Sequence, residues 1–371
     1  MKIGFFILAL AILLSMNSYV MVRGWHALPP VSVLRPVYLF SMLVLFVAMF
    51  AGMIFGSSMP PAVGKAVTFV GYTYMIIFIY LFLSFLLVDI VRLANYAIHF
   101  APAGMSVFRM WAMYITLGST AVALVIGNIK FNHPEIVTLN LSTEKPLQHK
   151  TLKIVAASDI HLGVSIDKKQ LQKYVKMIND QHPDIVLLPG DVSDREMKPV
   201  IAQHMDEELR SIKAPMGIFA INGNHEHYAE TPKATAEYLK KAGITFLCDE
   251  VSMVDSSFYI VGRDDRTNHK RKNLAEIVKG LDTTKPIILM DHQPFHLSEA
   301  ENNGIDLQIS GHTHNGQFFP GNLFVKRMFE LGHGYLKKGK THYYVSSGLG
   351  LWGPQYRIGT QSELVVINLK Y

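Results

Sequence analysis

The stretch LKIVAASDIH (residues 152–161) is a short apolar run that stops in a carboxylate and an imidazole. Four further stretches repeat this pattern: DIVLLPGDV (184–192), MGIFAINGNHE (216–226), PIILMDHQP (286–294) and IDLQISGHTH (305–314). Short runs of Ile, Val and Leu bounded by turn residues are typical of strands buried on both faces. The sequence therefore predicts at least five buried strands, each followed by a polar cluster.

Helical patterns lie between these runs. Residues 168–180 place Leu171, Val175 and Ile178 on one face, and residues 231–242 do the same with Ala234, Tyr238 and Ala242. Strands that alternate with helices predict α/β layers. In such sheets the ligand site lies at the carboxyl ends of the strands, where the polar clusters are found.

The clusters contain carboxylates, imidazoles and one amide, without a thiolate. They are Asp159, His161, Asp191, Asn224, His225, His292, His312 and His314. This donor set suits borderline divalent metals such as Mn, Fe or Zn. Seven of the eight can act as ligands, which is too many for one tetrahedral site and about right for two adjacent ions that clamp a phosphoryl displacement.

The spacing of the residues supports such a centre. In an extended D-x-H the two side chains share a face, so Asp159 and His161 can hold one ion. The glycine before Asp191 allows a tight turn that brings this carboxylate between both ions. By the same rule His312 and His314 lie side by side and can ligate neighbouring metals, and the glycines at 311 and 316 let the backbone come close.

The order D-x-H, G-D, G-N-H-E, H, G-H-x-H resembles that of the calcineurin-like metallophosphoesterases, over about residues 150–371. GHTHNGQ (311–317), VSSGLGLWGPQYR (345–357) and the apolar N-terminal segments resemble a branch of bacterial membrane-associated phosphohydrolases that includes lipid-directed members. The resemblance implies a four-layered α/β/β/α sandwich.

The resemblance also implies roles for single residues. Asp159, His161 and His314 would bind one ion, and Asn224, His292 and His312 the other, with Asp191 as the bridge. His225 matches the family's catalytic histidine, which lies close to the metals without ligating them. A water between two cations is a nucleophile near neutral pH, and His225 could protonate the leaving alkoxide.

Other polar residues have two interpretations each. Glu226 and Asp194 either orient the ligands or are solvated loop carboxylates. His227 faces the cleft or the solvent, His296 competes with His292 as a ligand, and Asp264 or Asp265 contacts substrate or forms a hairpin turn. Arg357 binds phosphate or makes a structural ion pair.

The first third of the chain has a different composition. Residues 1–129 hold only seven charged side chains, namely Lys2, Arg23, Arg35, Lys65, Asp89, Arg92 and Arg109. Residues 3–22, 37–64, 66–88 and 110–129 are uncharged and long enough to span a bilayer. We therefore expect a transmembrane region of four helices at 1–130 and a catalytic domain at 131–371.

The basic residues also bear on sidedness. The linkers at 23–36 and 89–109 carry four arginines, whereas the opposite side shows Lys2, Lys65 and Lys130. The positive-inside rule favours cytoplasmic linkers and a catalytic domain on the extracytoplasmic side of a bacterial cytoplasmic membrane. Asp89 is expected to pair locally with Arg92 rather than to act inside the membrane.

These observations favour a membrane-anchored, metal-dependent phosphoesterase that cleaves phosphoester or pyrophosphate bonds. Its partners would be the lipid bilayer and a phosphorylated small molecule or lipid. The alternative is a membrane sensor or scaffold whose domain binds metal without turnover, but such a domain has no use for His225. The net charge of +6 comes mostly from residues that flank the apolar segments, so no nucleic-acid partner is expected. The single cysteine, Cys248, excludes a disulfide framework within the chain.

Overall fold

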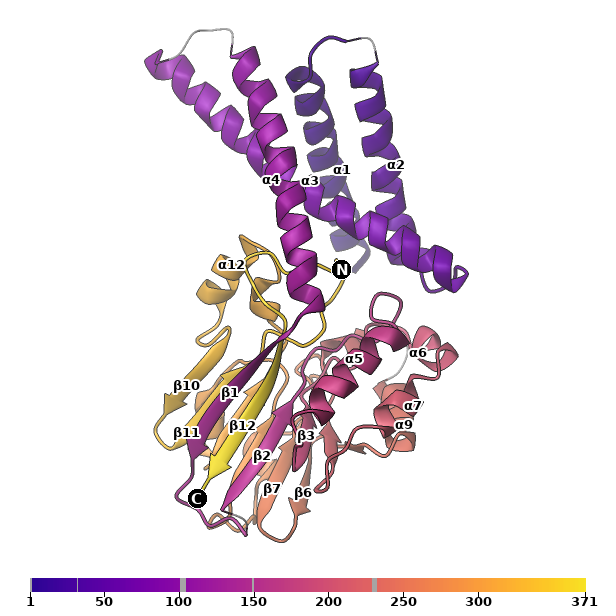
Figure 1. Cartoon of the computed structure of the whole chain (residues 1–371). Helices are drawn as coiled ribbons and strands as arrows, with labels where there is room; N and C mark the ends of the chain where they lie inside the picture. The colour runs from indigo at the N-terminus through magenta and orange to yellow at the C-terminus, as the bar shows by residue number, and fades with distance from the viewer. Residues whose placement is uncertain (1, 32, 101–104, 149, 229–231) are drawn as a thin grey trace. The chain divides into compact units, whose positions relative to one another are not determined.

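A computed structural model of the chain describes residues 2–31, 33–100, 105–148, 150–228 and 232–371. The chain divides into two compact units, residues 1–126 and residues 127–371. The N-terminal unit is helical and the second contains both sheets (Figure 1).

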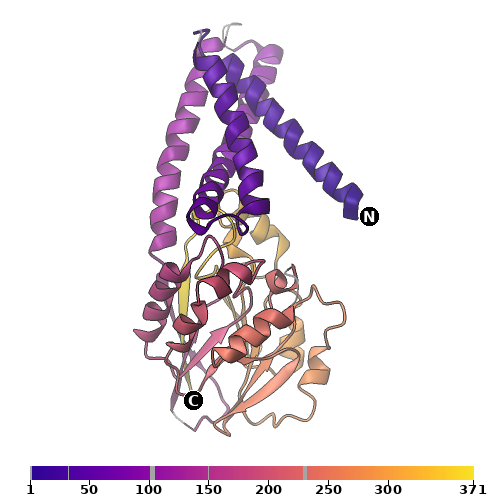
Figure 2. The same cartoon turned by 90° about the vertical axis from the view of Figure 1, so that its right-hand side faces the viewer.

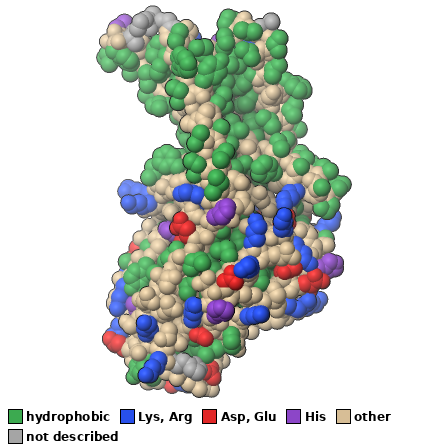
Figure 3. All heavy atoms as spheres, viewed as in Figure 1, with side chains coloured by type: hydrophobic (Ala, Val, Ile, Leu, Met, Phe, Trp, Pro, Cys, Tyr) green, Lys and Arg blue, Asp and Glu red, His purple; other side chains and the backbone are tan. Residues whose placement is uncertain are grey.

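The N-terminal unit is built from four long helices, α1 (Lys2–Ala27), α2 (Leu34–Phe55), α3 (Pro61–Ile98) and α4 (Ser106–Asn132), of which the end of α4 belongs to the second unit. All four are long and apolar enough to cross a membrane. Hydrophobic side chains cover the surface of these helices, whereas charged side chains gather on the second unit (Figure 3). The four predicted spans are thus confirmed as apolar helices.

The helices do not coincide with the full uncharged runs. The second helix ends at Phe55, near the end of the apolar centre of the run 37–64, because Gly56 and Pro60 fall in the turn that follows. The third helix begins at Pro61 and continues to Ile98. Glycines bring α2 and α3 into contact, since a Cβ atom at Gly71 would lie 2.5 Å from the Cα atom of Met49. Small residues at such positions let membrane helices approach closely.

The second unit contains two six-stranded sheets. The first has the order β1 (Glu135–Ser142), β12 (Glu363–Lys370), β2 (Thr151–Ala156), β3 (Ile185–Leu188), β4 (Ile218–Ala220), β5 (Thr245–Phe246). Strands β2 to β5 are parallel, β12 is antiparallel to β2, and β1 is parallel to β12. Figure 1 shows β1, β12, β2 and β3 side by side.

The second sheet has the order β10 (Gly334–Lys338), β11 (Thr341–Val345), β9 (Leu307–Ser310), β8 (Ile287–Met290), β7 (Phe258–Gly262), β6 (Glu250–Val254). Strands β11, β9, β8 and β7 are parallel, and the strands at both edges are antiparallel to their neighbours. All five predicted strands are confirmed: three lie in the first sheet and two in the second.

Alternation along the strands produces the layers. In β2, Ile154 and Ala156 face the second sheet, whereas Val155 faces the helices. The helices on that side are α5 (Lys168–Asn179), α6 (Lys198–Ala202), α7 (Met205–Arg210) and α9 (Pro232–Lys241) (Figures 1 and 2). The outer face of the second sheet is covered by α10 (Leu274–Ile277) and α11 (Ser298–Asn302). The expected α/β/β/α sandwich is therefore confirmed.

The helical faces were predicted with mixed success. In α5 the side chains of Leu171, Val175 and Ile178 are buried, as expected. In α9 the buried side chains are Thr235 and Leu239, one residue further along than Ala234 and Tyr238 of the predicted face, whereas Ala242, just after the helix, is buried as expected. Tyr238 is half-buried because its hydroxyl group is held by the backbone N–H and the carboxylate of Asp206. Thr231 lies outside the described residues.

Candidate metal centre

The eight residues predicted from the sequence come together in the second unit. They follow the carboxyl ends of β2, β3, β4, β8 and β9, and Asn224 and His225 open the short helix α8 (Asn224–Tyr228). His314 begins a single 3-10 turn, His314–Gly316. Six of the eight are less than 9% exposed, and His314 is 9% exposed. The strands thus gather residues that are up to 155 positions apart.

One cluster consists of Asp159, His161 and His314. The Nε2 atoms of the two imidazoles lie 3.2 Å apart, and Nε2 of His314 lies 3.5 Å from Oδ1 of Asp159. One potential ligand atom from each of the three residues lies within 4.8 Å of the others. This spacing can accommodate one cation.

A second cluster consists of Asn224, His292 and His312. The amide oxygen of Asn224 lies 2.7 Å from Nδ1 of His312 and 3.1 Å from Nε2 of His292. The other ring nitrogen of His292 lies 2.9 Å from the carbonyl oxygen of Pro189, so it donates there and leaves Nε2 directed at the cluster.

Asp191 lies between the two clusters. Its Oδ2 atom is 3.7 Å from Nε2 of His161 and 3.2 Å from Nε2 of His292. The predicted tight turn is present, since Gly190 has φ +91° and a Cβ atom there would lie 2.6 Å from the His292 ring. The carboxylate is thus shared by residues of both clusters.

The local backbone is not the extended one expected from the spacing. Asp159 and His161 both have φ 54°, and His312 and His314 have φ 70° and 48°. These are left-handed conformations that few residues other than glycine adopt. The same-face rule was therefore wrong for both motifs, and the side chains meet because each loop curls after its strand ends.

Glycine 311 permits the closest approach of these loops. A Cβ atom at Gly311 would collide with the Ser158 hydroxyl group and the Asp159 carboxylate. The backbone N–H of His312 donates to Oδ1 of Asp159 at 2.9 Å. The expected role of the first glycine in GHTHNG is confirmed.

Glu226 connects the loops that follow β3 and β4. Its fully buried carboxylate accepts the backbone N–H groups of Asp191 (3.0 Å), Ser193 (2.9 Å) and Gly223 (2.7 Å). Burial and the neighbouring charge of Asp191 raise the pKa of Glu226. Glu226 therefore orients the candidate ligands through their backbone and is not a solvated loop carboxylate.

His225 is positioned by a different carboxylate. Its Nδ1 atom lies 2.9 Å from Oδ1 of Asp194, and its ring centroid lies 4.5 Å from that of His161. Burial alone would lower the pKa of His225, but the hydrogen bond to Asp194 and the charge of Asp191 raise it. An imidazole with a raised pKa beside the clusters can hold and release a proton.

The charges in the centre are unevenly distributed. Burial would raise the pKa of Asp191, but the His292 and His161 imidazoles hold it well below its usual range. Burial raises the pKa of Asp159, and burial with the nearby His292 lowers that of His312 to about 4. Ionised carboxylates and neutral imidazoles are the forms that bind divalent cations, and the oxygen and nitrogen donors of this centre fit such ions by their chemical type.

Arg357 is held by backbone carbonyl groups and makes no ion pair among the described residues. It is fully buried, and its guanidinium group donates to the carbonyl oxygens of His314 (3.0 Å), Gly348 (3.1 Å) and Gly350 (2.6 Å). It also donates to the Ser362 hydroxyl group at 3.0 Å. Arg357 thus fixes the loop that carries His314.

The other residues with two interpretations lie around the centre. His227 pairs with the buried Asp264 at 2.9 Å, and Asp265 accepts hydrogen bonds from Gln293 at 2.9 and 3.0 Å. His296 is exposed, which leaves His292 as the candidate ligand. Asp264 and Asp265 therefore connect loops within the domain.

Some nearby residues were not predicted. The Trp352 ring lies 6.4 Å from the ring of His225, and the Phe329 ring lies 6.3 Å from that of His312. Neither residue has a spacing that signals its position, because both lie in irregular segments. The glycine-rich stretch 345–357, which contains Trp352, was the feature of the sequence that could have indicated a loop near the centre.

A family model described as calcineurin-like phosphoesterase matches residues 152–316. An uncharacterized metallophosphoesterase of Aquifex aeolicus is 32% identical over 262 residues, which cover 67% of this chain and 98% of the relative. One from Campylobacter jejuni is 35% identical over 243 residues, covering 64% of this chain and 63% of the relative. A transmembrane protein with metallophosphoesterase domain from Danio rerio is 32% identical over 269 residues, covering 68% and 61%.

The match thus spans about three fifths of the Campylobacter and Danio relatives. Among solved structures, a protein of Thermus thermophilus, TT1561, has a TM-score of 0.35 at 13% identity, covering 54% of this chain and 89% of that one. The motif order, the two-sheet fold and the near-complete match to the Aquifex relative agree. The chain belongs to the calcineurin-like metallophosphoesterase family.

Proposed function

We propose that this metallophosphoesterase is anchored in a bacterial cytoplasmic membrane and hydrolyses a phosphoester or pyrophosphate bond of a lipid-linked substrate. Residues 1–130 would form the anchor and residues 131–371 the catalytic domain. The observation that carries the proposal is the position of Asp191, within 3.7 Å of His161 on one side and 3.2 Å of His292 on the other.

The two clusters supply the metal ligands in this proposal. One divalent ion would be held by Asp159, His161 and His314. The other would be held by Asn224, His292 and His312, and Asp191 would bind both ions. Manganese, iron and zinc all suit these oxygen and nitrogen donors. The bound ions would supply the Lewis acidity that makes water a nucleophile near neutral pH.

The remaining chemistry falls to His225 and Asp194. Because Nδ1 of His225 faces Asp194 at 2.9 Å, Nε2 is free to carry the proton that the leaving oxygen needs. The Asp194 charge keeps the imidazole protonated at higher pH than burial would otherwise allow. His225 thus acts as the general acid, and Asp194 sets its tautomer.

A lipid-linked substrate is supported by an exposed apolar helix beside the centre. In α12 (Gly321–Met328), Leu323, Phe324 and Met328 are 56%, 65% and 67% exposed. Phe329, which ends this helix, contacts the His312 ring. Apolar side chains with Lys326 and Arg327 on one short helix are typical of elements that lie at a lipid surface.

The enzyme would be tested with full-length protein in neutral detergent, stripped of metal and then supplied with Mn, Zn or Mg. Substrates are bis-(p-nitrophenyl) phosphate and p-nitrophenyl phosphate. We expect metal-dependent turnover that falls by about 100-fold or more in His225→Ala, with metal content unchanged. The matched control is His269→Ala, which removes an exposed imidazole. Tight binding of two metals without cleavage of any phosphoester would favour the sensor or scaffold.

The substrate class needs a second comparison. Phe324→Ser should lower turnover of phosphatidic acid in mixed micelles by about tenfold, the effect of losing one buried aromatic side chain at the interface. Turnover of bis-(p-nitrophenyl) phosphate should not change. Ile201→Ser, at another exposed apolar position of the same domain, is the control. Equal effects on both substrates would contradict a lipid-directed role for α12.

The extracytoplasmic position of the catalytic domain rests on the arginines of the linkers. It would be tested by labelling with a membrane-impermeant thiol reagent in intact cells. Burial and neighbouring carboxylates raise the pKa of Cys248 to about 12, so this thiol is a poor target. Lys340→Cys in a Cys248→Ser background places a thiol at a side chain that is 86% exposed. Labelling only after cell lysis would place the domain in the cytoplasm.

A further inference from the structure

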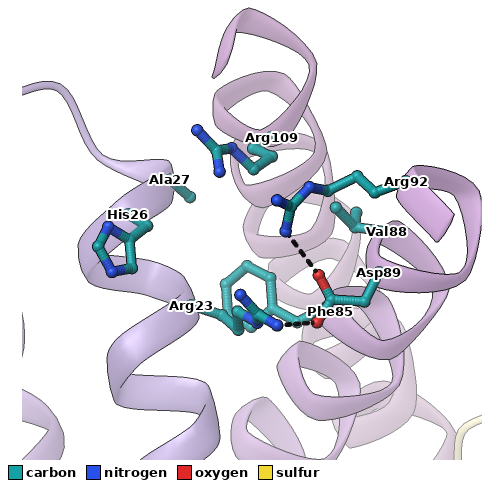
Figure 4. Close-up of a pocket in the computed structure, with 8 residues that line it drawn as sticks. All are labelled: Arg23, His26, Ala27, Phe85, Val88, Asp89, Arg92 and Arg109. Atoms are coloured by element: carbon teal, nitrogen blue, oxygen red, sulfur yellow. Dashed lines mark hydrogen bonds and ion pairs between the residues drawn. The ribbon is translucent and has the colours of Figure 1, made fainter. Parts of the chain in front are cut away.

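The N-terminal unit contains a hollow that the phosphoesterase chemistry does not use. Arg23, His26 and Ala27 of α1, Phe85, Val88, Asp89 and Arg92 of α3, and Arg109 of α4 line it (Figure 4). It is shallow and partly open to the surroundings, with an enclosed volume of about 10 Å³, so a ligand would lie across its mouth. We refer to it as the arginine pocket.

The arginine pocket holds more positive than negative charge. Arg23 Nη2 lies 2.6 Å from Oδ2 of Asp89, and Arg92 Nη1 lies 3.0 Å from Oδ1, so each carboxylate oxygen already has a cationic partner. The Tyr19 hydroxyl group also donates to Oδ2 at 2.7 Å. Asp89 is thus paired locally, as expected, but it balances only one of the three guanidinium charges.

Arg109 makes no salt bridge among the residues that the structure describes, and shares the single carboxylate of Asp89 with Arg23 and Arg92 only at longer range. Its Nε atom is buried and has no hydrogen-bond partner. In Figure 4 its side chain lies across from that of Arg92, on the opposite side of the pocket from Asp89. An unpaired cation at the end of an apolar helix bundle carries a desolvation cost that a bound anion would offset.

The walls of the pocket define the chemistry of that anion. Ala27, Phe85 and Val88 are 4%, 3% and 6% exposed and form an apolar floor. The neighbouring surface of α3 and α4 is also apolar, with Leu93 70% and Val107 63% exposed. A ligand with a negative head and apolar chains matches both surfaces.

We propose that Arg23, Arg92 and Arg109 bind the phosphate group of an anionic membrane lipid in the arginine pocket. Guanidinium groups bind phosphate oxygens through paired hydrogen bonds. Basic pockets between spanning helices on the cytoplasmic side recognise anionic headgroups, and the arginine-rich linkers are expected on that side. The site is separate from the metal centre, and its existence does not depend on the proposed catalysis.

The test measures lipid binding and not activity. Full-length protein in neutral detergent is titrated with phosphatidylglycerol, phosphatidylcholine or inorganic phosphate, and bound lipid is counted by native mass spectrometry. We expect one phosphatidylglycerol to bind about tenfold or more tightly than phosphatidylcholine, the size of one hydrogen bond to a charged group. Free phosphate that bound as tightly as phosphatidylglycerol, and displaced it, would overturn the lipid as the ligand.

Three variants locate the site. Arg109→Gln should weaken phosphatidylglycerol binding about tenfold, and because Arg109 makes no salt bridge among the described residues its loss should not lower the thermal midpoint. Asp89→Asn should strengthen binding, because it removes the competing carboxylate. Arg35→Gln removes an equal charge from the other arginine-bearing linker, at 23–36, where Arg35 lies outside the pocket lining and donates to the Leu28 carbonyl oxygen at 3.0 Å. Equal losses in Arg109→Gln and Arg35→Gln would show diffuse attraction and overturn the proposal.

Discussion

Nδ1 of His225 lies 2.9 Å from Oδ1 of Asp194, and the same carboxylate oxygen lies 3.8 Å from Nδ1 of His161. Asp194 therefore orients the candidate proton donor, whereas Nδ1 of His161 has no hydrogen-bond partner among the described residues. The His225 imidazole can present only Nε2 to a substrate while this contact persists. The pair fixes the direction of proton transfer in the proposed mechanism.

Asp194→Asn should lower turnover about 100-fold without loss of metal, because the amide no longer stabilises the charged imidazole. The pKa of His225 is raised by the hydrogen bond to Asp194. Loss of this hydrogen bond should lower the pKa of His225 and therefore move the alkaline limb of the kcat profile to lower pH. Asp180→Asn, at an exposed carboxylate paired with Lys176, is the control. An unchanged pH profile would show that Asp194 does not act through His225.

Gly311→Ala should abolish metal binding to the cluster of Asp159, His161 and His314. The added methyl group collides with the Ser158 hydroxyl group and the Asp159 carboxylate, so the loop after β9 must move away from the loop after β2. Gly163→Ala is the control, since its methyl group would make an ordinary contact 3.5 Å from Cβ of Asp194. Metal content by elemental analysis decides the outcome, and equal content in both variants would contradict it.

Arg357→Met should destabilise the catalytic domain by about 3 kcal/mol, because it leaves buried carbonyl oxygens without a donor. For a domain of this size the thermal midpoint would fall by about 6–12 °C. The loss of the donor to the His314 carbonyl oxygen should also weaken metal binding. Arg195→Met, which replaces an exposed arginine, should change neither quantity. An unaltered midpoint in Arg357→Met would contradict the structural role of this side chain.

His227→Gln should show a pH-dependent loss of stability. The hydrogen bond to Asp264 raises the pKa of His227 above its ordinary value of 6.5. Its contribution is therefore complete below that value and disappears as the pH rises through the higher folded value. In metal-free protein we expect the midpoint to fall by about 2 °C at pH 6 and by less at pH 9. His269→Gln is the control, and a larger loss at pH 9 would reverse the assigned sign.

The sequence predicted the residues of the centre better than the way in which they meet. Each buried strand ends in its polar cluster, so the carboxyl ends of parallel strands located Asp159, Asp191 and His292. The prediction also assumed that alternate residues share a face, as in a strand, but this alternation does not continue into the loops after the strands. Asp159 and His161 adopt left-handed backbones in a loop where their N–H groups donate to the carbonyl oxygens of Gly190 and Asp191, at 3.2 and 2.9 Å, and such contacts have no signature in sequence.

Arg357 illustrates the same difficulty. An arginine near a phosphoesterase motif can be interpreted equally well as a phosphate ligand or as half of an ion pair. Its partners are instead backbone carbonyl groups of residues 314, 348 and 350, which every sequence contains. The strands β1 and β12 were not predicted, because the strands with which they pair are distant in the chain.

Strand β1 pairs in parallel with β12, and Asn140 bonds to Asn368, 228 residues further along. On the ribosome β1 is made soon after α4 but must wait for almost the entire catalytic domain before it has a partner. Contacts of such long sequence separation form slowly, and an unpaired strand edge invites wrong pairings in the meantime. In the nascent protein the edges of β1 and β2 that pair with β12 would therefore stay unpaired until β12 has left the ribosome. Chaperones should bind mainly during that interval.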